Sequence, residues 1–433
     1  MSITRPLGFR AAATTAGIKP SGKPDLALIV CDDPPRIGEA PRPHSIDPRR
    51  TAAAVFTRNA VVGAPVEIGR AWRAKAIKGE ACLRAILVNA GCSNAATGQP
   101  GIDDARSTMR SVAEMLKCNP DEVMPSSTGV IGQRLPVDKI TRALPSLVQK
   151  LARGEEADEA AAAAIMTTDL VPKMAHKELE IGGKQVHLGA IGKGSGMIAP
   201  QMDSVGPQAT MLAFITTDAA VAPMALQHAL EDACRESFDR ISVDAHPSCS
   251  DSVFVMASGM AGGGIGKPGP IKTIHDGEPE YFAFRAALTA ICQSLATKVV
   301  RDGEGVTRTF RVEVKGAADA ASAEKMARAV VDSPLVKCAI HGKDPNWGRI
   351  VTAAGNAGVR FDTREATLTI GEIEVYRAGV PTGVGKTDAK LMAAMNADPV
   401  LCTLTVGHGQ GRAWMLGCDL SAEYVRINAE YTT

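Results

Sequence analysis

The sequence predicts an α/β fold divided into more than one domain. Its 433 residues exceed the roughly 100–200 residues of a typical domain, so we expect two or three domains. Hydrophobic residues make up 45% and charged residues 22%, values close to those of ordinary globular proteins. Short apolar runs typical of strands alternate along the chain with stretches of helical periodicity. These observations exclude a disordered or fibrous chain.

The first half of the chain carries strand and helix patterns in succession. Residues 84–89 (RAILVN) have the continuous apolar character of a buried strand. Residues 103–116 begin with two aspartates, which favour the start of a helix. Residues 137–151 and 156–166 continue as helices. Residues 179–189 hold a Gly-Gly pair between two alternating runs, which predicts a β-hairpin with a two-residue turn.

The following segments predict further strands and helices of the same core. Residues 211–216 and 252–257 have the apolar character of core strands, and a helix is expected between them from about residue 224 to residue 238. Residues 280–300 form the longest helical pattern of the chain. This first domain is therefore expected to extend over residues 1–305.

A second domain is expected over residues 306–433. The segment Asp-Gly-Glu-Gly at 302–305 reads as a turn, and the alternation of elements restarts after it. Residues 309–315 predict a strand and residues 321–331 a helix. Further strands and helices follow to residue 433.

The charge balance and the cysteines limit the classes of function. With 48 Lys+Arg against 47 Asp+Glu, the formal net charge is +1, which gives no global attraction to nucleic acid or anionic lipid. No apolar run approaches the roughly 18–20 residues that span a bilayer, and residues 1–10 lack a signal-peptide pattern. The ten cysteines contain no CxxC pair, which favours reduced, buried thiols. We expect a cytoplasmic protein without nucleic-acid or membrane partners.

One segment combines residues that could carry chemistry. Over residues 192–217, a glycine-rich loop with Lys193 leads into an apolar strand that starts near Thr210. If the chain cut itself before Thr210, the new α-amine, with an ordinary pKa of ~7.7–8.0, could serve as the general base for the threonine hydroxyl. The small residue Ala209 would leave the carbonyl open to attack. From composition alone, an ordinary loop that enters a strand, with Thr210 as a strand former, is the favoured interpretation.

Many short strings occur in a characteristic order along the whole chain: residues 8–12, 17–22, 55–57, 127–132, 164–169, 193–200, 209–212, 216–218, 302–305, 344–350 and 424–429. Together these strings resemble the ornithine acetyltransferase family, also called glutamate N-acetyltransferases, which are self-cleaving enzymes with an N-terminal threonine. The agreement of many unrelated strings in sequence order is more specific than any single motif.

The resemblance implies self-cleavage between Ala209 and Thr210, giving chains 1–209 and 210–433 that stay together. It also implies that an acetyl group moves from N-acetylornithine to glutamate in arginine biosynthesis, through an acyl-threonine on Thr210. The oxyanion donors of the family match Thr128 and Gly129, a hydroxyl and a backbone N–H. Without the resemblance, residues 126–129 read as a turn of small polar residues.

The substrate-binding positions of the family also have matches. A cation, an anion and neutral donors suit an amino acid, which carries both an ammonium and a carboxylate. A structural interpretation stands beside each assignment: Lys193 as a solvated loop charge, Glu304 as a turn residue and Thr433 as a frayed end. The matching residues are Thr167, Thr168, Lys193, Thr210, Glu304, Asn428 and Thr433.

The resemblance also implies the architecture and the partners. The fold is expected to be a mixed α/β sandwich of the ornithine acetyltransferase type, with a larger first domain and a smaller C-terminal α/β domain. The cleaved chains are expected to form an α2β2 heterotetramer, with small amino acids as substrates. No metal or tightly bound cofactor is implied, and acetyl-CoA enters only as an alternative acetyl donor that some members use.

Three segments depart from the family pattern. Residues 203–208 (DSVGPQ) are extra residues just before the expected cut, and residues 32–50 look like an insertion. Residues 243–251 (VDAHPSCSD) replace the usual VDGDTSTND, and the glycine-rich segment 260–270 follows. His246 and Cys249 in this string are too few for a metal site and are interpreted as packing residues.

These departures keep two other functions open. The protein could be an amidohydrolase or an acyltransferase of the same family that acts on a different N-acyl amide. It could also be a homologue that does not cleave itself and acts as a binding partner. An uncut chain would identify the second case, and a release of acetate that does not depend on an amino-acid acceptor would identify hydrolysis.

Overall fold

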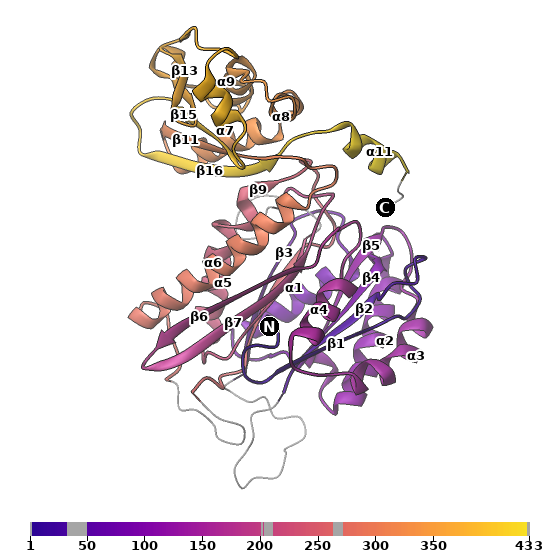
Figure 1. Cartoon of the computed structure of the whole chain (residues 1–433). Coiled ribbons are helices and arrows are strands. Elements are labelled where there is room, and N and C mark those ends of the chain that lie inside the picture. Colours follow the sequence, from indigo (N-terminus) through magenta and orange to yellow (C-terminus); the bar gives the residue numbers. More distant parts are fainter. Residues whose placement is uncertain (1, 33–49, 201, 203–210, 263–271, 431–433) are drawn as a thin grey trace. The chain divides into compact units, whose positions relative to one another are not determined.

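The chain forms two compact units in the computed structural model, which describes residues 2–32, 50–200, 202, 211–262 and 272–430 (Figure 1). Unit 1 comprises Met1–Asp239 and Pro247–Ala296. Unit 2 comprises Arg240–His246 and Thr297–Thr432. Each sheet lies within one unit, and the units are described separately below. The domain boundary expected near Gly305 stays a prediction.

The first sheet of unit 1 has the strand order β1-β2-β4-β5. Neighbouring strands are antiparallel except for β4 and β5, which are parallel. Its strands are β1 (Phe9–Thr14), β2 (Leu26–Cys31), β4 (Ala85–Cys92) and β5 (Val123–Val130).

The second sheet of unit 1 has the order β3-β10-β8-β7-β6, and only β8 and β10 are parallel neighbours. The expected hairpin is confirmed as β6 and β7. Its Gly182 and Gly183 have φ values of 56° and 71°, as a two-residue turn with two left-handed positions requires. The strands are β3 (Thr51–Phe56), β6 (Lys173–Ile181), β7 (Lys184–Lys193), β8 (Leu212–Thr217) and β10 (Ser252–Ala257).

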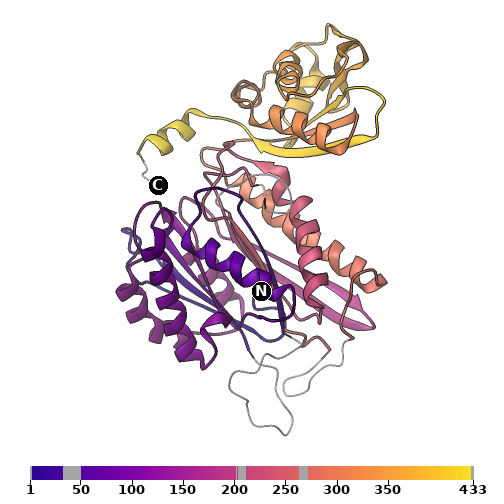
Figure 2. The same ribbon diagram turned by 180° about the vertical axis from the view of Figure 1, so that it is seen from behind.

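Some helices of unit 1 lie between its two sheets, and the others cover the outer faces of these sheets (Figures 1 and 2). α1 and α4 lie between the sheets, because Trp72 of α1 and Ala161 of α4 share one core with Phe9 of the first sheet and Phe214 of the second. α2 and α3 cover the other face of the first sheet. α5 and α6 pack against the second sheet. The helices are α1 (Ala64–Ala76), α2 (Gly98–Leu116), α3 (Val137–Gln149), α4 (Glu155–Ala164), α5 (Pro223–Arg235) and α6 (Pro279–Arg301).

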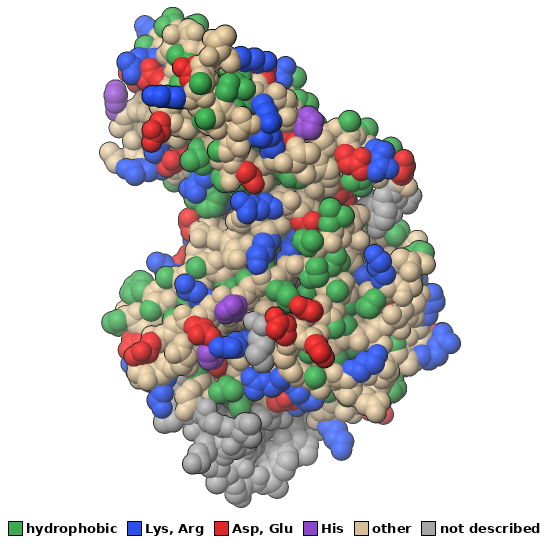
Figure 3. Space-filling view, viewed as in Figure 1, with side chains coloured by type: hydrophobic (Ala, Val, Ile, Leu, Met, Phe, Trp, Pro, Cys, Tyr) green, Lys and Arg blue, Asp and Glu red, His purple; other side chains and the backbone are tan. Residues whose placement is uncertain are grey.

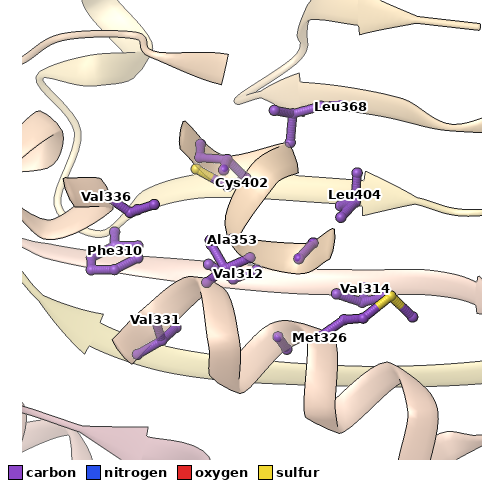
Figure 4. Packing of buried hydrophobic residues seen from close by; sticks show 14 of the residues in the cluster. Phe310, Val312, Val314, Met326, Val331, Val336, Ala353, Leu368, Cys402 and Leu404 are labelled. Carbon is purple, nitrogen blue, oxygen red and sulfur yellow. The ribbon is translucent and has the colours of Figure 1, made fainter. Parts of the chain in front are cut away.

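Unit 2 is built around a seven-stranded sheet with the order β14-β13-β12-β15-β11-β16-β9. Its core fills the space between this sheet and the helices, as Figure 4 shows for Phe310, Val312, Met326 and Leu404. The strands are β9 (Ile241–Ser242), β11 (Thr309–Ala317), β12 (Thr367–Ile370), β13 (Ile373–Arg377), β14 (Val380–Pro381), β15 (Val400–Thr405) and β16 (Gly411–Cys418). The helices are α7 (Ala320–Asp332), α8 (Pro334–His341), α9 (Trp347–Gly355), α10 (Ala389–Met395) and α11 (Ala422–Glu430).

The α/β class and most of the expected elements are confirmed. The strand expected at 84–89 is β4, the strand at 252–257 is β10, and the helix at 280–300 is α6. The helix expected from residue 103 begins earlier, at Gly98. β1, β2, β3 and α1 had no expected counterpart.

The surface agrees with the near-zero net charge. On the face shown in Figure 3, acidic and basic side chains are interspersed and form no continuous patch of one sign. None of the helices in the described parts of the chain is long and apolar enough to cross a membrane.

Candidate active site

Thr128 and Gly129 lie near the end of β5, and not in a turn. The turn interpretation of residues 126–129 is therefore wrong: this segment pairs in parallel with β4, and the register shifts at Gly91 and Cys92. Gly129 has a φ of 127°, and a Cβ atom there would lie 2.4 Å from the carbonyl carbon of Gly91. Only glycine allows the two backbones to come this close.

The polar side chains of this strand end are held by the neighbouring strand. Ser127 Oγ donates a hydrogen bond to Asn89 Oδ1 at 2.6 Å, and Asn89 Nδ2 donates to the carbonyl of Cys92 at 2.8 Å. Asn89, Ser127 and Thr128 are all buried. Asn89 and Ser127 are tolerated in this buried strand end because their polar groups find partners.

Lys193 connects two of the threonines that the sequence singled out. It is the last residue of β7 and is only 2% exposed, so it is not a solvated loop charge. Its ammonium donates to Thr167 Oγ1 at 2.9 Å and to Thr128 Oγ1 at 3.2 Å. Each threonine oxygen accepts in these bonds, which leaves its hydroxyl hydrogen to donate elsewhere. A charged donor also makes that hydroxyl a stronger donor in turn.

Asp169 balances the charge of Lys193, and the sequence reasoning gave it no role. Its carboxylate accepts from Lys173 Nζ and from the Gly194 amide, both at 2.7 Å, and from the Thr167 amide at 3.0 Å. Burial favours the neutral acid, but the ammonium groups of Lys193 and Lys173 outweigh burial and lower the pKa of Asp169 to about 2. Asp169 is therefore an anion that fixes the backbone on both sides of the cluster.

The other predicted binding residue of this region, Thr168, lies beside the cluster. It is half-buried and follows Thr167, the threonine that contacts Lys193. Within the described residues, the structure shows no hydrogen bond from Thr168 to the lysine.

Lys19 is a second cation near this cluster. Its ammonium donates to the carbonyl oxygens of Pro24 at 2.8 Å and Ala164 at 3.0 Å. Burial lowers its pKa to about 8; the charge of Asp25 opposes this effect and that of Lys193 adds to it. Lys19 therefore ties its loop to the end of α4, three residues before Thr167.

Two further predicted residues meet in unit 2. Glu304, 8% exposed in the turn after α6, accepts a hydrogen bond at 2.8 Å from Asn428 Nδ2 of α11. Asn428 also donates to the carbonyl of Tyr424 at 3.0 Å, and the Tyr424 hydroxyl donates to Asp244 at 3.4 Å. Burial raises the pKa of Tyr424, and the nearby charges of Asp244 and Glu304 raise it further. Asp244 of the altered string thus contacts the helix that carries Asn428.

The expected nucleophile and two other predicted residues, Ala209, Thr210 and Thr433, lie outside the described residues, as do residues 203–208, 33–49 and 263–271. The residues that follow Thr210 are described. Met211 is buried, and its carbonyl accepts from the amide of Ser252 at 3.0 Å. Leu212, the first residue of β8, pairs with Lys193 of β7. Thr210 therefore stands two residues before a strand position that pairs with the site lysine.

The His246 and Cys249 string shows no metal site. Across the described ranges, no group of three or more His, Cys, Asp or Glu side chains is placed to hold a metal ion. Cys249 is 5% exposed, and burial raises the pKa of its thiol. Its sulfur lies 3.4 Å from Ser250 Oγ. A buried neutral thiol of this kind is a packing residue.

Comparisons with known proteins give a consistent result over the full length. The ArgJ family model matches residues 10–433. The chain is 42% identical over 446 residues to the arginine biosynthesis bifunctional protein ArgJ of Thermosynechococcus vestitus, covering 100% of this chain and 98% of that protein. It is 43% identical over 439 residues to the protein of the same name from a Synechococcus species, covering 100% and 97%.

A solved structure is similar over part of the chain. It is that of ornithine acetyltransferase from Mycobacterium tuberculosis complexed with ornithine. It is 35% identical, with a TM-score of 0.37, and covers 46% of this chain and 95% of that chain.

Proposed function

Because the chain belongs to the ArgJ family, we propose that it transfers an acetyl group from N-acetylornithine to glutamate through an acyl-threonine on Thr210. The observation that carries this proposal is the contact of the buried Lys193 with Thr128 and Thr167. These three residues come from separate strings of the sequence, and the fold brings them together beside the start of β8. The matched relatives are named as bifunctional proteins of arginine biosynthesis.

The proposed processing step makes the catalytic base. Thr210 Oγ attacks the carbonyl carbon of Ala209, the peptide C–N bond breaks, and water hydrolyses the resulting ester. The products are a carboxylate on Ala209 and a free α-amine on Thr210. This amine lies next to its own hydroxyl and can accept the hydroxyl proton.

Acetyl transfer then proceeds in two balanced halves. Thr210 Oγ attacks the acetamide carbonyl, the α-amine takes the proton, and the C–N bond breaks as that proton passes to the leaving amine of ornithine. The α-amine of glutamate next attacks the acetyl ester, and the Oγ–H bond is restored as N-acetylglutamate leaves. Glutamate and water compete for the acetyl ester on Thr210, and the acetyl group is transferred whenever glutamate reacts first.

Thr128 and Gly129 suit the stabilisation of the oxyanion in both halves. The oxygen of Thr128 accepts from Lys193, so its hydroxyl hydrogen can donate to the developing negative charge. The N–H of Gly129 would provide a second donor beside it. Loss of one such donor typically slows catalysis by about 10²–10³-fold.

Lys193 and Thr167 suit the α-carboxylate that N-acetylornithine and glutamate share. A buried ammonium attracts a carboxylate more strongly than an exposed one, because water screens it less. Asp169 keeps this lysine in place without using the two threonine hydroxyls. Glu304 and Asn428, which form a hydrogen bond at 2.8 Å within unit 2, stay candidate substrate-binding residues on the strength of the resemblance.

The first test is the denatured mass of the purified protein. We expect two fragments, with the second beginning at Thr210. Thr210→Ala should give a single chain of about 45.2 kDa and no turnover. Thr210→Ser is the matched control, since it keeps a hydroxyl and an α-amine and should still cleave. A cleaved, active Thr210→Ala protein would refute the assignment of the nucleophile.

The second test identifies the acceptor. With N-acetylornithine labelled in the acetyl group, glutamate should accelerate the release of ornithine and carry the label as N-acetylglutamate. Release of labelled acetate at a rate independent of glutamate would instead show an amidohydrolase. Acetyl-CoA in place of N-acetylornithine tests the alternative donor in the same assay.

We also propose that the cleaved chains pair as α2β2. This predicts a native mass of about twice the 45.2 kDa of one full chain by light scattering. A mass of one full chain would contradict the assembly without affecting the proposed chemistry.

A further inference from the structure

Lys19 is a cation beside the candidate active site, and neither the resemblance nor the proposed reaction gives it a role. It is half-buried in the loop between β1 and β2. Its ammonium has three N–H donors. Within the described residues, two of them are used, by the carbonyl oxygens of Pro24 at 2.8 Å and Ala164 at 3.0 Å. The third donor is left for a ligand.

The backbone around Lys19 is fixed by a buried carboxylate. Asp25 is fully buried, and its side chain accepts from three amides of the loop. These are the amides of Ala16 at 2.6 Å, Ile18 at 2.5 Å and Lys19 at 3.0 Å. The carbonyl of Asp25 accepts from the amide of Ala90 in β4 at 2.9 Å. The loop that carries Lys19 is thus tied to the strand next to β5.

The side chain of Lys19 lies against the strand pair that holds the proposed oxyanion donors. A Cβ atom on Gly91 would lie 3.2 Å from Cγ of Lys19. A Cβ atom on Gly129 would lie 2.4 Å from the carbonyl carbon of Gly91. The lysine stem, Gly91 and Gly129 are therefore in successive contact. Beyond them, the ammonium reaches the carbonyl of Ala164, three residues before Thr167.

The ammonium of Lys19 also lies within electrostatic range of the Lys193 cluster. Burial is the largest effect on it and lowers its pKa to about 8. Of the nearby charges, Asp25 and Asp169 raise this pKa, and Lys193 and Lys23 lower it further. At pH 7, about nine tenths of the molecules therefore carry a charged Lys19.

The two proposed substrates share an α-carboxylate and differ at the end of the side chain. N-acetylornithine ends in an ammonium, and glutamate ends in a carboxylate. If both substrates place the α-carboxylate at Lys193, their side-chain ends bring opposite charges to the same region. A second cation near Lys193 suits glutamate, which has two carboxylates. A cation that gives up its proton close to neutral pH also tolerates the ammonium of ornithine.

We propose that Lys19 binds the γ-carboxylate of the acceptor and thereby makes the second half of the reaction selective for glutamate. This proposal rests on the proposed function, since it requires an amino acid as acceptor. Lys193 and Thr167 hold the α-carboxylate that both substrates share. The third N–H donor of Lys19 forms a charge-assisted hydrogen bond to the carboxylate that only glutamate has.

Glutamine is the probe for this contact, because it is nearly isosteric with glutamate and its side chain is neutral. Since the reaction has two separate halves, kcat/KM for an acceptor reports the acceptor half alone. The wild type should favour glutamate over glutamine at least about tenfold in kcat/KM, the size expected of a hydrogen bond between charged groups. A wild type without this preference would overturn the proposal.

Lys19→Gln separates the charge from the tethering of the loop, because its amide can still donate to the carbonyl groups of Pro24 and Ala164. We expect its preference for glutamate over glutamine to fall below about threefold, while kcat/KM for N-acetylornithine changes less than about threefold. Lys19→Arg keeps the charge and should retain most of the preference. An unchanged preference in Lys19→Gln would overturn the proposal. An equal loss of kcat/KM for the donor and both acceptors would also overturn it, since it would show a structural role.

Lys139→Gln is the matched control. Lys139 is an exposed residue of α3 that binds the same loop through the carbonyl of Gly17 at 2.7 Å. Its substitution removes one positive charge and one tether of the loop. It should leave the preference for glutamate and the kcat/KM for N-acetylornithine unchanged.

The outcomes separate this proposal from the proposed function. A wild type that transfers the acetyl group to no amino acid would refute the proposed function and this proposal with it. Transfer to glutamate with an equal preference in wild type and Lys19→Gln would refute only the role of Lys19.

If Lys19→Gln fails to fold, the pH dependence of the wild type supplies the test. The preference for glutamate over glutamine should fall about tenfold from pH 7 to pH 9, as Lys19 loses its proton. Groups that bind the α-amine and the α-carboxylate act on both acceptors alike, so their titration cancels in this ratio. A constant preference would overturn the proposal.

Discussion

The close approach of Gly129 to Gly91 allows a quantitative test of how the proposed oxyanion donors, Thr128 and Gly129, are held in place. In Gly129→Ala, the new Cβ would lie 2.4 Å from the carbonyl carbon of Gly91 and 2.6 Å from the amide nitrogen of Cys92. Ordinary contacts between such atoms are roughly 3.5–4.0 Å. These neighbours are backbone atoms, so β4 and β5 must move apart by about 1 Å.

The chain offers a matched control in Gly132. It also has a positive φ, 80°, but a Cβ there would meet nothing within 4 Å. Gly132→Ala therefore measures the cost of the backbone conformation alone, about 1–2 kcal/mol, reduced by up to about 1 kcal/mol because alanine restricts the unfolded chain. Gly129→Ala adds an overpacking cost of about 1–3 kcal/mol. We expect total losses of about 1 kcal/mol for Gly132→Ala and about 2–4 kcal/mol for Gly129→Ala.

Tryptophan fluorescence can report on the correct unit. The chain has three tryptophans, and Trp72 is the one in unit 1. Urea unfolding of both variants in a background with Trp347→Phe and Trp414→Phe would follow unit 1 alone. The kcat of Gly129→Ala should also fall by about 10²-fold, since the shift displaces the Gly129 N–H and the Thr128 hydroxyl. Equal loss of stability and activity in the two variants would refute this reasoning.

Three further predictions follow from the site and the thiols. Lys193→Met keeps a long apolar side chain but removes the ammonium that binds Thr128 and Thr167, so KM for N-acetylornithine should rise at least about tenfold. The control variant Lys177→Met, on the exposed side of β6, should leave KM unchanged. Equal KM values for the two variants would show that Lys193 does not bind the substrate. The pKa of Asp169 is lowered to about 2 in the folded protein from an ordinary 3.8, so its contribution of about 2 kcal/mol is complete well above pH 4 and is lost as the pH falls toward 2. The stability difference between wild type and Asp169→Asn should therefore be about 1 kcal/mol smaller at pH 3 than at pH 6, and a constant difference in urea unfolding would contradict it. Iodoacetamide should modify the exposed Cys338 long before the buried Cys82 and Cys418, because burial raises the thiol pKa of both buried cysteines to about 11. Peptide mass mapping measures the order of labelling. If Cys82 were labelled first, the fold around it would have to open.

The elements that the sequence predicted well are those with a local cause. The Gly182–Gly183 pair supplies the two left-handed positions that the hairpin turn needs, so β6 and β7 could be located from their turn. The apolar run of β10 could likewise be recognised without knowledge of its neighbours. In both cases the signal lies within a few residues of the element.

β5 could not be recognised, because its polar residues are stabilised from a distance. Ser127 and Thr128 are buried in a strand only because Asn89 and Lys193 provide hydrogen bonds from other elements. The alanine-rich strand β3 gave no signal for a related reason: alanine has little preference for strands, and Thr51–Phe56 is a strand because β10 pairs with it. Such partners cannot be read from local sequence.

The residues of the site likewise divide into those that the sequence identified and those that only the structure revealed. The resemblance named Thr128, Thr167 and Lys193, and the structure brings them into contact. It gave no role to Asp169, whose importance depends on the backbone amides that it binds. A usable signal was present in the sequence, since Asp169 is the last residue of the string 164–169, but a single aspartate in a loop also fits a surface charge.

The order of strands in the second sheet determines when the chain can safely be cut. β3, β7 and β6 precede residue 209 in the sequence, while β8 and β10 follow it, and the sheet places β10 and β8 between β3 and β7. A polypeptide severed during its synthesis on the ribosome would release an N-terminal half with two unpaired strand edges, which are prone to aggregate. The same sheet, once complete, joins the halves by continuous ladders on both sides of β8 and β10. If the chain cuts itself before Thr210, as proposed, folding must come before cutting, and a cleavage that depends on the folded sheet would keep the two events in this order without a separate protease.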